Sequence, residues 1–173
     1  PQASWMKLRW LRLLAARGDW RPFVAHYDPK MNFTELDCLY GQYQLISGQK
    51  EQGYATAEKL WLVGKSQHNA CDALVERWED EGQLTEALRW KRAKLAVEIG
   101  NYGLAKFLVK SLPTLNAQGE LLLDVAQKPQ LLSQPERFSP ATETMGDVVS
   151  IGLRRLARVN PEQALGLLDS YAR

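Results

Sequence analysis

The sequence predicts an all-α protein, and three observations lead to that prediction. The 173-residue chain contains 27 Leu and 18 Ala but only 9 Val and 3 Ile. Leu and Ala favour helices, whereas β-branched residues favour strands. Glycines recur through the first hundred residues at helical intervals, and apolar residues between them follow the period of a helix. No run of alternating polar and apolar residues, which would indicate a strand, is present in the sequence.

The expected helices follow from their end signals. Glycine is favoured just past a helix C-terminus because it adopts a left-handed backbone without a Cβ clash. Five glycines predict such ends: Gly18, Gly48, Gly64, Gly82 and Gly100. Asp19, Thr34 and Asn160 are candidate N-caps, and Pro161 suits the first helical position after Asn160. About ten helices are expected, over 4–17, a short stretch after 19, 34–47, 49–63, 69–81, 84–99, 101–111, 116–127, 143–159 and 161–171, with a turn of helix and a loop over 130–140.

The helices are also spaced with a rough period. The pair Gly48-Gln49 recurs 34 residues later as Gly82-Gln83. A helix-turn-helix unit of about 34 residues is the tetratricopeptide-like period, although the consensus residues of that repeat are not present. Such pairs bury their apolar faces by stacking. We therefore expect a right-handed superhelix of stacked antiparallel helix pairs, an α-solenoid, with residues 1–173 as one continuous helical-repeat segment.

Composition excludes several functional classes. Lys and Arg total 22 and Asp and Glu total 20, so the net charge of +2 leaves no electrostatic footprint for nucleic acid. No stretch approaches the ~20 apolar residues of a membrane span. The sequence begins Pro1-Gln2-Ala3 without an initiator Met, and its last residues lie in an amphipathic pattern, so we expect a piece of a longer protein. No phosphate loop, nucleophile elbow or metalloprotease motif is present, and we expect no cofactor.

Two cysteines and two histidines are the candidate metal ligands. His68 and Cys71 are three residues apart, but His26 and Cys38 are twelve apart, so the spacing does not fit the close ligand pairs of structural zinc sites, and no metal site is expected. Cys38 and Cys71 are 33 residues apart, almost one repeat, so equivalent helices could bring them together. The residues leave two interpretations open: a disulfide, or two unpaired buried thiols as in a cytosolic protein.

Tryptophans and basic clusters could each carry a binding function. Six tryptophans are many for this length, and aromatic faces bind sugars, but in helical repeats they are usually packing residues. Basic residues alternate with apolar ones around three helices, which favours a solvated face over an anion site. The three clusters are Lys7, Arg9 and Arg12; Arg89, Lys91, Arg92 and Lys94; and Arg154, Arg155 and Arg158.

One local stretch resembles a known family. The run from Lys59 to Asp72, KLWLVGKSQHNACD, is similar to a segment in the N-terminal helical domain of the large soluble lytic transglycosylases of Gram-negative bacteria. The stretch from Arg9 to Trp20 and the region of Cys38 also resemble that family, and later helices resemble it more loosely. The segment around Cys71 is the specific part, and it is not a catalytic signature.

The resemblance implies a periplasmic protein that acts on peptidoglycan. In this family a superhelical domain closes into a ring that carries a lysozyme-like domain, which cleaves the glycan with one catalytic Glu and leaves a 1,6-anhydro product. The resemblance also implies that Cys38 and Cys71 form a disulfide. The family's catalytic Glu lies in a Glu-Ser pair, and no Glu of this sequence is followed by Ser. The catalytic domain is therefore expected to be absent, with no catalytic residue to name.

Three functional hypotheses follow. The first is a non-catalytic scaffold segment of the ring, which helps to hold or orient peptidoglycan; the sequence does not indicate which residues face the glycan. Other cell-wall proteins are further candidate partners. The second is a tetratricopeptide-like adaptor that binds another protein and keeps Cys38 and Cys71 reduced. The third is a self-sufficient hydrolase with an unrecognised cluster of perturbed acids.

Overall fold

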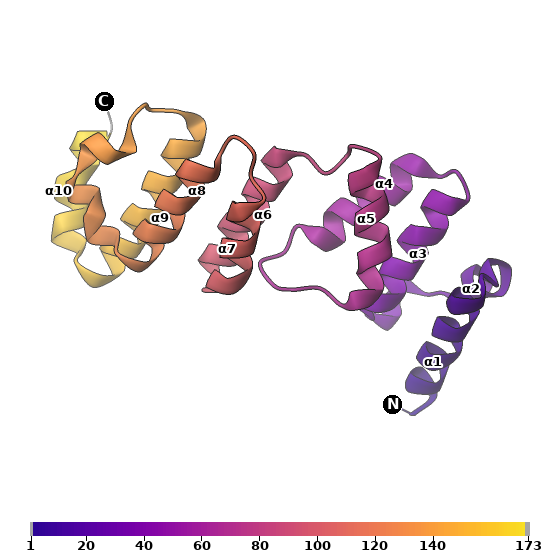
Figure 1. Cartoon of the computed structure of the whole chain (residues 1–173). Coiled ribbons are helices and arrows are strands. Elements are labelled where there is room, and N and C mark those ends of the chain that lie inside the picture. The colour runs from indigo at the N-terminus through magenta and orange to yellow at the C-terminus, as the bar shows by residue number, and fades with distance from the viewer. Residues whose placement is uncertain (1, 172–173) are drawn as a thin grey trace. The chain divides into compact units, whose positions relative to one another are not determined.

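A computed structural model gives the structure of residues 2–171. Over that range it contains ten α-helices, four short 3₁₀ helices and no strand (Figure 1). The all-α class and the expected number of helices are therefore confirmed. The chain divides into two compact units, Pro1–Thr85 and Glu86–Arg173. Several consecutive helices pack against each other across short turns, among them Thr34–Ile46 with Lys50–Trp61 and Glu86–Glu98 with Tyr102–Lys110.

The first unit packs its helices around α3. Its elements are α1 (Gln2–Arg17), α2 (Trp20–His26), η1 (Pro29–Met31), α3 (Thr34–Ile46), α4 (Lys50–Trp61), η2 (Asn69–Cys71) and α5 (Asp72–Asp80). Four side chains at most 2% exposed join α1, α2 and α3: Leu8, Leu11, Phe23 and Leu36. Between α4 and α5, Trp61 packs edge to face against Trp78, with ring centroids 5.7 Å apart. Each large apolar side chain buried in this way stabilises the fold by about 1.5–3 kcal/mol.

The second unit continues the pairing of helices. Its elements are α6 (Glu86–Glu98), α7 (Tyr102–Lys110), α8 (Asn116–Gln127), η3 (Pro129–Ser133), η4 (Pro135–Phe138), α9 (Glu143–Val159) and α10 (Pro161–Tyr171). Asp147 of α9 joins this helix to α6. Its Oδ2 accepts hydrogen bonds from Trp90 Nε1 at 2.8 Å and from Lys94 Nζ at 2.6 Å. The indole N–H of the buried Trp90 is therefore satisfied by a residue 57 positions away.

Four helices end in the same type of turn. Gly18, Gly48, Gly82 and Gly100 have φ between 73° and 83°. At each, the glycine N–H donates to the carbonyl three residues back, and the next N–H donates to the carbonyl five residues back. This is the Schellman arrangement, which satisfies the last carbonyls of the helix. The prediction that Gly64 closes its helix is wrong: α4 ends three residues earlier, at Trp61, and its C-cap is Leu62.

The N-cap predictions had mixed outcomes. Asn160 caps α10 as expected, because its Oδ1 accepts from the Gln163 N–H at 3.1 Å. Asp19 holds the N-cap position of α2, but its side chain makes no capping hydrogen bond. Thr34 is not a cap. The N-cap of α3 is Phe33, whose backbone is extended and whose carbonyl already accepts helical N–H groups, so the helix includes Thr34.

Helices α3 and α4 approach closely at Gly53. A Cβ atom at this position would lie 2.7 Å from Leu45 Cγ and 3.2 Å from the Leu45 backbone nitrogen. Leu45 is 2% exposed and packed on all sides, so it has little room to move. The absence of a side chain at Gly53 is therefore what allows this pair of helices to pack at its present distance.

An ionic network joins α4 to the end of α5. The carboxylate of Glu81 accepts hydrogen bonds from the Tyr54 hydroxyl, from Lys50 Nζ at 3.0 Å and from Arg77 Nε at 3.1 Å. These bonds, that from Tyr54 first, stabilise the charged form and lower the pKa of Glu81 to about 2. The carboxylate thus connects two helices for as long as it remains ionised.

We expect acid to weaken this network. A carboxyl group with a lowered pKa in the folded state contributes stability above its unfolded pKa of about 4.3, and that contribution is lost as the pH falls through about 2. Glu81→Gln should therefore lower the free energy of unfolding at pH 6, and the difference should shrink toward pH 2 and vanish below it. Urea unfolding at several pH values measures this. Glu76→Gln, an exposed change on the same helix, is the control; an equal acid dependence in both variants would contradict the prediction.

Candidate functional site

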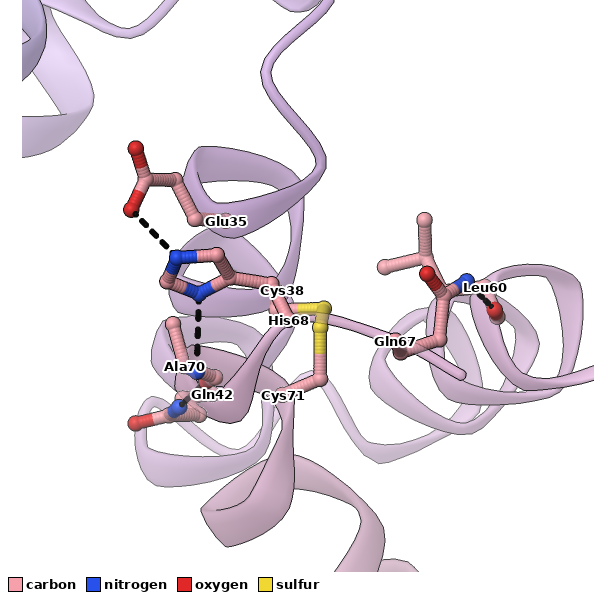
Figure 2. The surroundings of a disulfide bond; sticks show 8 residues. All are labelled: Glu35, Cys38, Gln42, Leu60, Gln67, His68, Ala70 and Cys71. Atoms are coloured by element: carbon pink, nitrogen blue, oxygen red, sulfur yellow. Dashed lines mark hydrogen bonds and ion pairs between the residues drawn. A yellow bond between two sulfur atoms is a disulfide. The ribbon is translucent and has the colours of Figure 1, made fainter. Parts of the chain in front are cut away.

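A disulfide joins α3 to η2. Cys38 Sγ and Cys71 Sγ are bonded at 2.00 Å, with the Cα atoms 4.9 Å apart (Figure 2). Both residues are at most 2% exposed. This is the pairing that the family resemblance implies, and it removes the interpretation of two unpaired thiols. Because both sulfurs are bonded to each other, neither is a thiolate that could bind zinc.

The histidines of the considered zinc set have other roles. His26 lies on α2, where its Nδ1 donates to the Pro22 carbonyl at 3.0 Å. His68 Nδ1 instead accepts from the Ala70 N–H at 3.1 Å, at the N-cap of η2. Residues 2–171 contain no group of three or more His, Cys, Asp or Glu side chains placed to hold a metal ion.

Hydrogen bonds fix the segment that precedes Cys71. Gln42 Nε2, on α3, donates to the Ala70 carbonyl at 2.8 Å. Gln67 Nε2 donates to the Leu60 carbonyl, near the end of α4 (Figure 2). The segment is thus tied to α3 and to α4 as well as by the disulfide. The run that resembles the transglycosylases therefore forms a structural junction.

The buried acid Glu35 extends this junction toward α1. Because His68 Nδ1 is an acceptor, the ring proton lies on Nε2, which faces Glu35 Oε2 at 3.3 Å (Figure 2). Arg12 Nε lies 3.5 Å from the same oxygen. Glu35 is 8% exposed, so these contacts replace water around its carboxylate. One carboxylate therefore connects α1, α3 and the His68 segment.

The acids with shifted pKa values do not resemble a glycosidase pair. Such an enzyme needs a carboxylic acid whose pKa is raised, so that it can donate a proton. The pKa of Glu81 is lowered by its hydrogen bonds. The pKa of Glu86 is also lowered, first by the Thr114 hydroxyl at 2.6 Å and then by the N–H groups of Thr114 and Leu115. Both shifts run opposite to the direction that a general acid requires.

The basic clusters are used partly inside the second unit. Arg92 is 7% exposed, so placing it on a solvated face was wrong. Lys94 contacts Asp147, Arg154 forms an ion pair with Glu98 at 3.0 Å, and Arg155 donates to the Val97 carbonyl at 2.6 Å. These cations hold α9 against α6. The helical pattern of basic and apolar residues does not predict these contacts, because they depend on how α6 and α9 pack in the folded unit.

Tryptophans divide into packing and exposed residues. Trp61, Trp78 and Trp90 are at most 5% exposed, as expected of packing residues. Trp5 and Trp10 of α1 are 60% and 41% exposed. Trp20 belongs to a closed cycle of neighbouring rings between α2 and α3. Successive ring centroids in that cycle are 4.4–6.1 Å apart, in the order Trp20, Phe23, Tyr27, Tyr40 and Tyr43.

One side of this aromatic cycle borders a cleft of about 520 Å³. We call it the tyrosine cleft, and its lining residues are Val24, Tyr27, Pro29, Asn32, Asp37, Tyr40, Thr56, Lys59 and Leu60. Tyr27 stacks on Tyr40 at 4.4 Å, and the Tyr27 hydroxyl donates to Asp37 Oδ1 at 2.6 Å. Burial first, and then this hydrogen bond, raise the pKa of Tyr27 well above its usual value. No pattern in the sequence marks these residues as a site.

The packed helix pairs define the chain as a helical-repeat protein of the all-α class. No family model matches the chain. The soluble lytic murein transglycosylase of Escherichia coli (strain K12) is 31% identical over 173 residues, which cover 99% of this chain and 27% of that protein. In the region described here, no helix has both the length and the apolar character needed to cross a membrane.

Two solved structures extend the comparison. An inactive mutant of the lytic transglycosylase Slt from Pseudomonas aeruginosa is 64% identical, with a TM-score of 0.96 over 99% of this chain. The 70-kDa soluble lytic transglycosylase in complex with bulgecin A is 31% identical, with a TM-score of 0.76 over 99%. The resemblance to the soluble lytic transglycosylases is therefore confirmed along nearly the whole chain. The chain spans 28% of the length of each of these two structures.

Proposed function

We propose that this chain is a non-catalytic helical segment of a periplasmic peptidoglycan lytic transglycosylase. Its role is to help hold or orient peptidoglycan strands for a catalytic domain outside the 173 residues. The observation that carries the proposal is the match of 99% of the chain, at 64% identity, to 28% of a lytic transglycosylase. The sequence lacks the Glu-Ser pair of the family's catalytic site, which favours a non-catalytic role for this segment.

The disulfide supports the proposed compartment. Structural disulfides form and persist in oxidising compartments such as the bacterial periplasm and are rare in the cytosol. The Cys38–Cys71 bond is buried between α3 and η2 and closes a 33-residue separation. A cytosolic adaptor would keep these two thiols reduced, so the bond favours the periplasmic scaffold over that alternative. Contact with other cell-wall proteins stays a prediction.

Co-sedimentation with purified peptidoglycan sacculi tests the proposal. We expect the chain to pellet with sacculi in a saturable manner, and the supernatant to contain no soluble muropeptides by mass spectrometry. Cellulose of equal mass is the control polymer and should not retain the chain. Release of 1,6-anhydro muropeptides would show a catalytic site in this segment. A chain that stays in the supernatant would contradict peptidoglycan binding by these residues.

A further inference from the structure

We propose that the tyrosine cleft is a binding subsite for an uncharged saccharide, an inference that rests on the proposed function and names the ligand of one surface within it. The cleft is formed by the end of α2, the η1 segment, α3 and α4, all within the first unit. Its volume of about 520 Å³ lies within the range of ~300–1,000 Å³ that is typical of small-molecule sites.

The polar groups of the cleft are available to a ligand. Asp37 uses Oδ1 to accept from Tyr27, while its Oδ2 has no hydrogen-bond partner among the described residues. The Tyr40 hydroxyl and the ammonium group of Lys59 likewise have no partner within residues 2–171. A carboxylate accepts from sugar hydroxyls, an ammonium group donates to hydroxyl or carbonyl oxygens, and a phenol does both. The cleft therefore offers donors and acceptors together, as a polyhydroxylated ligand requires.

The charges of the cleft favour no net charge on the ligand. Asp37 and Lys59 carry opposite charges, so the lining residues sum to zero net charge. Each of these groups attracts a ligand charge of opposite sign and repels one of like sign, so the pair gives no net preference for an anion or a cation. An N-acetylated sugar ring has neither charge, and its hydroxyl and amide groups match the donors and acceptors described above.

The cleft is organised before a ligand arrives. The 2.6 Å hydrogen bond that the Tyr27 hydroxyl donates holds Asp37 in place. The ring of Tyr40 is held between Tyr27 at 4.4 Å and Tyr43 at 6.1 Å. Groups that are already fixed lose little conformational freedom on binding, which favours affinity.

Titration with the β-1,4-linked tetramer of N-acetylglucosamine tests this subsite, using amide chemical shifts of the whole chain. We expect saturable shifts that cluster around Tyr27, Asp37 and Tyr40. Tyr40→Phe keeps the ring but removes the hydroxyl, and should weaken binding about fivefold, the effect of one hydrogen bond. Tyr43→Phe is the matched control, because Tyr43 belongs to the same aromatic cycle but does not line the cleft. It should bind within twofold of the unmodified chain.

A second variant keeps the test independent of folding. Lys59 is an exposed residue of α4, so Lys59→Gln should leave the fold intact and also weaken binding about fivefold. Absence of saturation by the tetramer, shifts centred elsewhere, or equal affinity in all variants would overturn the subsite. Tighter binding of a free stem peptide than of the tetramer would overturn the saccharide assignment.

Sacculus co-sedimentation of the same variants separates this inference from the proposed function. If the unmodified chain pellets and both Tyr40→Phe and Lys59→Gln pellet equally well, the cleft is wrong while the scaffold role stands. If the chain does not pellet but binds the tetramer through the cleft, the subsite stands and peptidoglycan binding by this segment fails. Parallel losses in both assays support the two together.

Discussion

Replacing both cysteines with alanine is expected to lower the free energy of unfolding by about 3–4 kcal/mol. The Cys38–Cys71 bond closes a separation of 33 residues, and the chain-entropy model assigns about that stabilisation to a loop of this length. The removal should act on the first unit, because both cysteines lie within it. A lower melting temperature, by roughly 10 °C for a chain of this size, should accompany it.

Urea unfolding followed by circular dichroism measures this change. Dithiothreitol should destabilise the unmodified chain by a similar amount and leave the variant Cys38→Ala/Cys71→Ala unaffected. That second comparison separates the bond from the loss of packing around the two sulfur atoms. If the double variant unfolds at the same urea concentration as the oxidised chain, the disulfide does not stabilise this junction.

Gly53→Ala is expected to lower the free energy of unfolding by about 1–3 kcal/mol, which is typical of overpacking a filled core. Alanine in a helix is ordinarily favoured over glycine by about 1 kcal/mol, so the expected sign is reversed by tertiary contact. The cause is the approach of the new Cβ to Leu45, at 2.7 Å from Cγ and 3.2 Å from the backbone nitrogen.

Gly166→Ala supplies the matched control on α10. A Cβ atom there would meet no atom within 4 Å, so helix propensity alone should decide the outcome. That variant should be slightly more stable than the unmodified chain in thermal and urea unfolding. A Gly53→Ala chain that is stabilised to the same extent would show that α3 and α4 can separate without cost.

Local signals predicted the helices wherever the helix ends are determined locally. The expected ranges 116–127 and 143–159 agree with α8 and α9, and the Asn160 cap begins α10 as its sequence indicates. The end of α4 before Gly64 was not predicted, because the Gln67 side chain in the segment that follows α4 bonds the Leu60 carbonyl near the helix end. The Gln42 side chain of α3 likewise bonds the Ala70 carbonyl in η2, a contact that no local pattern indicates.

The disulfide and the cleft show two different limits of the sequence. Spacing placed Cys38 and Cys71 one repeat apart but left their oxidation open until the family resemblance was considered. The cleft had no signal at all, because Tyr27, Asp37 and Lys59 come from three elements with no fixed spacing. Their meeting depends on how α2, α3 and α4 pack, which is a property of the folded unit.

The hydrogen bond from Trp90 to Asp147 has a consequence for biogenesis. Its partners are 57 residues apart, so the indole has no acceptor until α9 has been synthesised. At an elongation rate of roughly 5–20 residues per second, that interval lasts on the order of several seconds. The two cysteines of the first unit are 33 residues apart and can meet sooner. Once the chain is in an oxidising compartment, the N-terminal disulfide can thus close without waiting for α9, because both cysteines lie in the first unit.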